Sequence, residues 1–178
     1  MAKRQSLKEL QERLAQRLTA ARSEGVTASW LAVEVGGQPC LLPLVQSGEI
    51  FPWTPVQTVP YTRPWYVGVA NLRGGLFGVI DLASLLNAAA GSAPAVSDRV
   101  TSESRLVSLH AALGVNAVLW VDRLLGLRGA ASFVRVEDAP AQAPRWATRV
   151  LVDAQAGAWQ ELDLQALVND TAFLAIAA

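Results

Sequence analysis

Residues Val59 to Leu82 read VPYTRPWYVGVANLRGGLFGVIDL. Within this stretch, Tyr66–Leu72 is an apolar run rich in β-branched residues, Gly74-Gly75 has the composition of a tight turn, and an apolar run returns at 76–80. Two prolines precede the first run, and because proline lacks a backbone donor, that segment fits neither a central strand nor a helix interior. The stretch therefore predicts a loop followed by a β-hairpin.

Short apolar runs on both sides of this hairpin predict further strands. Turn signals such as Gly36-Gly37 and Gly114 separate them. The expected strands cover residues 30–35, 38–44, 49–53, 106–111, 115–121, 126–128, 147–152 and 159–162, whereas 132–145 reads as irregular. Many closely spaced short strands favour β-barrels or a sandwich over βαβ units. One group of strands before Ala88 and another after Ser104 indicate two lobes.

Helices are expected near both ends of the chain. Residues 7–23 place Leu7, Leu10, Leu14 and Leu18 on one narrow stripe, which predicts a helix in an N-terminal extension, 1–26. The stripe suits packing on the body of the protein or on another chain. In the remaining domain, 27–178, Asp81 and Asp163 are expected to cap helices at 82–87 and 164–169. The Ala-, Ser- and Pro-rich segment 88–104 reads as a mobile loop.

Composition limits the classes of function. The 15 Lys and Arg balance the 15 Asp and Glu, so the basic stripe of a nucleic-acid-binding protein is not expected. No apolar run approaches the ~20 residues of a membrane span, and the first residues are polar, which predicts a cytosolic chain without a signal peptide. With 52% hydrophobic and 17% charged residues, either apolar surface faces partners or the core is dense.

Groups that could carry chemistry are few. His110 is the one histidine and Cys40 the one cysteine, so neither a zinc cluster nor another metal site is expected, and a Ser-His-Asp triad would depend on His110 alone. Asp81 and Asp122 each follow an apolar strand, where capping or turn duty is the ordinary role. No phosphate-binding glycine motif is present, and no cofactor is expected. The six tryptophans fit a core-filling role.

As one ordered block, the Val59–Leu82 stretch resembles the central signature of the CheW family of coupling proteins. The family pattern is a Pro-containing loop, Gly-Val-x-Asn-Leu-Arg-Gly, and a strand that ends in Asp-Leu. Here these are GVANLRG at 68–74 and VIDL at 79–82. Val67 and Gly78 depart from the residues common in the family. A preceding helix and a tryptophan-rich body look more like the PilI subfamily of type IV pilus (twitching) systems.

The resemblance implies a mainly β fold of two small five-stranded SH3-like barrels, with an N-terminal helix and a short C-terminal helix. It also implies no catalysis: a cytoplasmic scaffold, recruited to membrane receptor arrays, joins a chemoreceptor tip to the regulatory domain of a CheA-like histidine kinase. Gly68 would let a partner helix approach the backbone, and Arg73 would reach a partner carboxylate. The partner-binding residues expected on this basis are Glu49, Val67, Gly68, Val69, Asn71, Arg73, Leu106 and Leu127.

Two other classes stay open at this point. A small β-barrel enzyme or metabolite-binding protein would need a polar pocket between the lobes, near His110 or Asp122. A nucleic-acid-binding barrel would show a steep salt dependence of binding, although the net charge of zero disfavours it.

The leucine stripe of the N-terminal extension gives the first testable prediction. If residues 7–23 dock on the body of the protein, deletion of 1–26 should lower the melting temperature and leave partner choice unchanged. Thermal unfolding and pull-down from native lysate measure the two effects. Changed partners with unchanged stability would show that the helix serves another chain instead.

Overall fold

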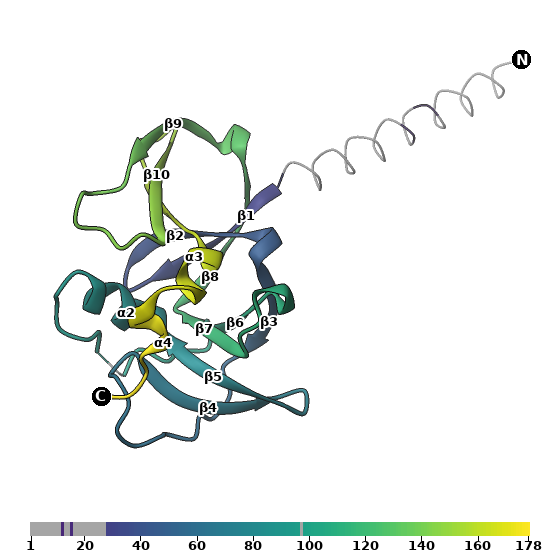
Figure 1. Cartoon of the computed structure of the whole chain (residues 1–178). Helices are drawn as coiled ribbons and strands as arrows, with labels where there is room; N and C mark the ends of the chain where they lie inside the picture. The colour runs from purple at the N-terminus through teal and green to yellow at the C-terminus, as the bar shows by residue number, and fades with distance from the viewer. Residues whose placement is uncertain (1–11, 13–14, 16–27, 97) are drawn as a thin grey trace, which may run out of the picture.

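Two β-sheets form the body of the protein in the computed structural model, which describes residues 12, 15, 28–96 and 98–178 (Figure 1). The first sheet has the strand order β8-β1-β2-β11-β10-β9. Its strands are β1 (Ala28–Val35), β2 (Gln38–Pro43), β8 (Arg123–Gly129), β9 (Phe133–Asp138), β10 (Ala147–Asp153) and β11 (Ala158–Leu162). We call this part the six-stranded lobe.

The second sheet, in the five-stranded lobe, has the order β3-β6-β7-β5-β4. Its strands are β3 (Ser47–Pro52), β4 (Tyr66–Leu72), β5 (Gly75–Asp81), β6 (Arg105–Leu109) and β7 (Ala117–Val121). Most neighbours are antiparallel, but β5 pairs with β7 and β2 with β11 in parallel. The mainly β, two-lobed fold expected from the sequence is confirmed.

The lobes are interleaved along the chain, which corrects the expected division around residues 88–104. The chain passes from the six-stranded lobe into the five-stranded lobe at the turn η1 (Leu44–Gln46). It returns to the six-stranded lobe at Asp122, between β7 and β8. Strands β6 and β7 therefore complete the five-stranded lobe instead of opening the second one. Grouping strands by sequence distance failed because the loop before β6 returns to the sheet that it left.

Strand β9 was not expected, because 132–145 was interpreted as irregular, and it raises one lobe from five strands to six. It pairs only with β10, at the sheet edge. Val134 and Val136 alternate with Arg135 and Glu137, but both valines are exposed, so no buried face marks the strand. The short turn η3 (Ala130–Ser132) joins the end of β8 to the start of β9.

Short helices lie where the capping aspartates predict them. The Asp81 carboxylate accepts from Ala83 N–H (3.2 Å) and begins α2 (Leu82–Ala89), and Asp163 accepts from Ala166 N–H (3.1 Å) at the start of α3 (Leu164–Val168). The tail adds α4 (Thr171–Leu174), whose Phe173 is buried. The predicted helix at 7–23 lies outside the described residues, except for Glu12 and Ala15, which are helical.

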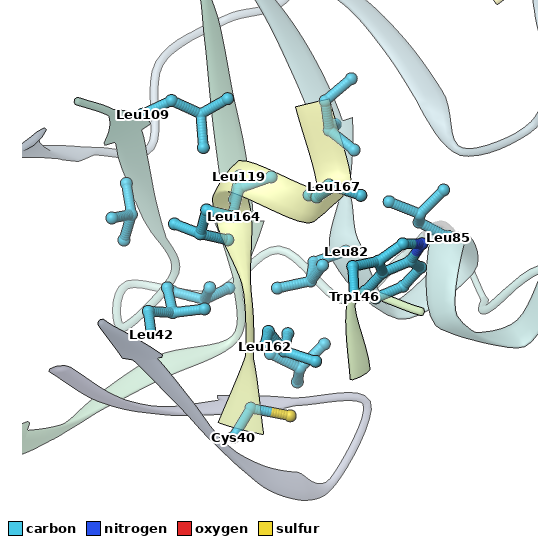
Figure 2. Close-up of a cluster of buried hydrophobic side chains, with 14 of the residues drawn as sticks. Cys40, Leu42, Leu82, Leu85, Leu109, Leu119, Trp146, Leu162, Leu164 and Leu167 are labelled. Carbon is cyan, nitrogen blue, oxygen red and sulfur yellow. The ribbon is translucent and has the colours of Figure 1, made fainter. Parts of the chain in front are cut away.

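One hydrophobic core lies between the two sheets and belongs to both. Strand β7 is buried at every position, and its side chains alternate between two cores. Leu119 and Val121 face the core shared by the lobes, whereas Val118 and Trp120 fill the interior of the five-stranded lobe. Figure 2 shows Leu119 among side chains from β2, β6, α2 and α3, with Leu164 and Leu167 beside it.

A third core fills the six-stranded lobe, where Trp30 packs edge-on against Phe133 at a centroid distance of 5.6 Å. Trp65 and Trp146 lie in the shared core, and Trp159 in the third one. The core-filling role expected of most tryptophans is thereby confirmed.

The shared core predicts that the two lobes unfold together. Leu119→Ala removes a fully buried side chain and should cost about 2–5 kcal/mol in one cooperative urea transition. Leu174→Ala, on exposed α4, should stay within about 0.5 kcal/mol of the wild type. Two separate transitions, one per lobe, would contradict a core that both lobes share.

Candidate functional site

An exposed ion pair joins the two edges of the five-stranded lobe. Glu49 lies on edge strand β3, and Arg73 lies in the turn between β4, the opposite edge strand, and β5. Arg73 Nη2 is 2.5 Å from Glu49 Oε1, so the sheet curls until its edges meet. The Arg73 side chain is 76% exposed and that of Glu49 43%, which leaves both charges open to another molecule.

The turn that presents Arg73 is locally specified. Leu72 pairs with Gly75, and the two residues between them, Arg73 (φ 50°) and Gly74 (φ 80°), both have positive φ, as in a type I′ hairpin turn. Asn71 Oδ1 accepts a hydrogen bond from Gly74 N–H at 3.1 Å. Positive φ in a residue with a Cβ costs about 1–2 kcal/mol, so this short turn holds arginine in a conformation it does not favour.

The structure therefore brings together three of the residues expected from the sequence: Glu49, Asn71 and Arg73. Two exposed apolar side chains adjoin them: Ile50 follows Glu49, and Leu76 lies opposite Asn71 in the β4–β5 ladder. The sequence analysis missed both, because an apolar residue in a strand is ordinarily assigned to a core. We call Glu49, Ile50, Asn71, Arg73 and Leu76 the turn patch.

The expected close approach of a partner helix to Gly68 is wrong. Gly68 is buried, with φ +147°, and a Cβ built on it would lie 2.1 Å from the Gln57 carbonyl oxygen. Gln57 and Val69 exchange backbone hydrogen bonds of 2.8 and 2.9 Å, so the proline-rich loop covers this part of β4. The absent side chain therefore accommodates the protein's own loop.

The other expected residues are dispersed. Leu106 is fully buried in the core of the five-stranded lobe, so its expected place in a groove is wrong: β6 points it inward. Val67 packs partly against the same core, and Val69 is half-buried. Leu127 is exposed, but it lies on β8 of the six-stranded lobe.

His110 and Asp122, considered for a polar pocket between the lobes, lie apart. His110 is exposed, and its Nδ1 accepts from Ala112 N–H (3.1 Å) at the start of a 3-10 turn. The strand expected over 106–111 ends at Leu109, so His110 lies just past it. Asp122 lies at the other end of the β6–β7 pair, because Arg105 is opposite Val121. The four strand residues between Arg105 and His110, roughly 13 Å of strand, therefore separate His110 from Asp122.

Cys40 is buried, which changes the acidity of its thiol. Burial raises the pKa of the Cys40 thiol to about 12, so it stays protonated at neutral pH. Among residues 28–96 and 98–178, no three His, Cys, Asp or Glu side chains gather as a metal site would require. In the same described part of the chain, every helix is too short or too polar to cross a membrane.

Comparison with known proteins identifies similar chains. The family model described as a CheW-like domain matches residues 29–172. A protein described as a probable chemotaxis protein CheW from Rhizobium etli is 36% identical over 56 residues, which cover 32% of this chain and 36% of that protein's length. The crystal structure of the scaffolding protein TtCheW from Thermoanaerobacter tengcongensis superimposes with a TM-score of 0.59 at 17% identity, over 76% of this chain and 88% of that one.

Gly68 gives a prediction about packing. Gly68→Ala should lower the free energy of unfolding by about 1–3 kcal/mol, because the methyl group would clash with the Gln57 backbone. Gly91→Ala is the matched control: its φ is also positive (+69°), but nothing lies within 4 Å of its Cβ position. Urea unfolding of both variants measures the difference. Equal losses would show that backbone conformation alone requires glycine at position 68.

Proposed function

We propose that this chain, which belongs to the CheW-like family, is a non-catalytic coupling protein that links a chemoreceptor to a CheA-like histidine kinase. The observation that carries this proposal is the turn patch, an exposed ion pair bordered by exposed apolar side chains. Such a surface suits recognition by another protein, because apolar contacts supply affinity while charges fix register.

Arg73 is the residue that we assign to partner contact. Its guanidinium has donors beyond the one directed at Glu49, and an exposed ion pair is easily exchanged because it contributes only about 0–1 kcal/mol. A partner carboxylate can therefore replace or share the Glu49 contact. Asn71 acts indirectly, because its hydrogen bond to Gly74 shapes the turn that projects Arg73.

The partners in this proposal are the regulatory domain of the kinase and the cytoplasmic tip of the receptor. Val67, Val69 and Leu127 stay in the proposed contact set as half-buried or exposed apolar residues. Gly68 contributes by letting the 54–64 loop pack on β4. The module would act in the cytoplasm at membrane receptor arrays, holding the kinase in place and biasing it between states.

A narrower version assigns the chain to a PilI-type twitching system, on the strength of the N-terminal extension and the tryptophan-rich body. Capture from native lysate distinguishes the versions. Recovery of a pilus-system kinase and receptor would support the narrower assignment, and recovery of a swimming-chemotaxis kinase would replace it.

Charge reversal at Arg73 tests the proposal. Arg73→Glu should weaken capture of kinase or receptor at least about tenfold, because it places like charges against the partner carboxylate. The melting temperature should change by less than about 4 °C, since only a surface pair is lost. Arg135→Glu is the control, because Arg135 forms a similarly exposed pair with Glu137 on the other lobe.

A charge swap then shows whether Arg73 contacts the partner or only shapes the turn through its ion pair with Glu49. The double variant Glu49→Arg, Arg73→Glu restores an ion pair with reversed polarity. If Arg73 contacts the partner, binding stays weak; if the pair only shapes the turn, binding returns. Normal capture by Arg73→Glu alone would remove Arg73 from the interface.

A further inference from the structure

Arg99 forms a partly buried cluster with two carboxylates, more ion-pair partners than any other cation in the described part of the chain. Its Nη2 donates to Asp81 Oδ1 and its Nη1 to Asp122 Oδ1. The guanidinium carbon lies 4.4 Å from the centroid of the Trp120 ring, over the ring. The Arg99 side chain is 18% exposed, so water screens these contacts little. Nothing in the sequence distinguishes this arginine from other charges in an Ala- and Pro-rich loop.

The two carboxylates are tied to different lobes. Asp81 ends β5, and its Oδ2 accepts from Ser84 Oγ at 2.5 Å, at the start of α2. Asp122 stands at the crossover after β7, and its Oδ2 accepts at 2.6 Å from Gly36 N–H, in the β1–β2 turn of the six-stranded lobe. Arg99 therefore links the loop before β6 to both lobes at once.

The same loop borders an aromatic cavity of about 430 Å³. Pro94, Ala95 and Val100 line it on the loop side, and Trp53, Tyr66 and Trp120 on the body side. The Trp120 Nε1–H is buried without a hydrogen-bond acceptor. The cavity has aromatic walls and stays partly open to solvent, so the loop narrows its mouth without sealing it.

Polar contacts, more than apolar burial, hold the loop on this cavity. Ala95 N–H donates to Ser84 Oγ at 3.0 Å, and Arg99 Nε donates to the Val96 carbonyl at 2.9 Å. Val96 and Val100 remain exposed, at 72% and 40%. A segment that buries little apolar surface has a low free energy of local opening once its hydrogen bonds are lost. Without Arg99, two carboxylates would also be left beside each other uncompensated.

We propose that Arg99 is a latch: its two ion pairs hold the loop against the rim of the Trp53–Tyr66–Trp120 cavity and fix the β1–β2 turn against the five-stranded lobe. Opening of the latch widens the cavity without unfolding either lobe, because the three hydrophobic cores do not include Arg99. The device gives the fold two local states that differ in the position of one loop.

Hydrogen exchange of the full chain, with Arg99→Gln, tests the latch. Exchange in residues 92–104 should rise about tenfold or more, because two charge-assisted hydrogen bonds are lost, and exchange at the 35–38 turn should rise with it. A hydrophobic fluorescent dye, bis-ANS, should bind the opened cavity. Arg135→Gln, which removes an exposed ion pair on β9, should change none of these signals.

A second variant keeps the test decisive if Arg99→Gln does not fold. Arg99→Lys retains the charge but lacks the fork that engages two carboxylates, so intermediate exchange in 92–104 is expected. If exchange and dye binding of a folded Arg99 variant match those of Arg135→Gln, the latch is overturned. Increased exchange spread evenly over all strands would also overturn it, since that result describes global destabilisation.

Discussion

The hydrophobic core between the two sheets is the constraint on which the rest of the structure depends. The central strand β7 has two buried faces, and the period of two along a strand sends its alternate side chains to different cores. Val118 and Trp120 stabilise one lobe, whereas Leu119 and Val121 bind that lobe to the other. Neither sheet can therefore bury its apolar residues alone. This arrangement also explains why the central strands read as continuous apolar runs instead of alternating ones.

The parts of the fold encoded locally could be predicted from the sequence. The Gly36-Gly37 turn, the capping roles of Asp81 and Asp163 and most strands depend on neighbouring residues and were correctly located, whereas the turn expected at Gly74-Gly75 lies one residue earlier, at Arg73-Gly74. Strand β9 was missed because edge pairing leaves its valines exposed, so its alternation carries no burial signal. The interleaved order of the lobes was missed as well. It depends on which distant strands pair, and no local pattern between Gln38 and Val121 encodes that choice.

In the candidate site, too, the locally encoded residues could be predicted and those brought together by distant strand pairing could not. A motif placed Asn71 and Arg73 on one turn, but only curling of the sheet brings Glu49 to Arg73. Gly68 does require the absence of a side chain, but not for the approach of a partner helix. The atoms that exclude a side chain there belong to the chain's own Gln57. Arg99 illustrates the limit of sequence reasoning. A single arginine acquires its role from Asp81 and Asp122, which lie 18 and 23 positions away in opposite directions.

The interleaved topology has a consequence for biosynthesis. All five strands of one lobe have left the ribosome by Val121, whereas β1 and β2 must wait for β8, roughly 80 residues after β2 ends. At about 5–20 residues per second, the delay is roughly 4–16 s, which is long compared with the folding of a small β domain. During that interval the nascent β1–β2 hairpin has apolar side chains on both faces and no partner strand. The newly made chain is then open to aggregation. Early assembly of the five-stranded lobe would give the hairpin an apolar surface to pack against until β8 is made.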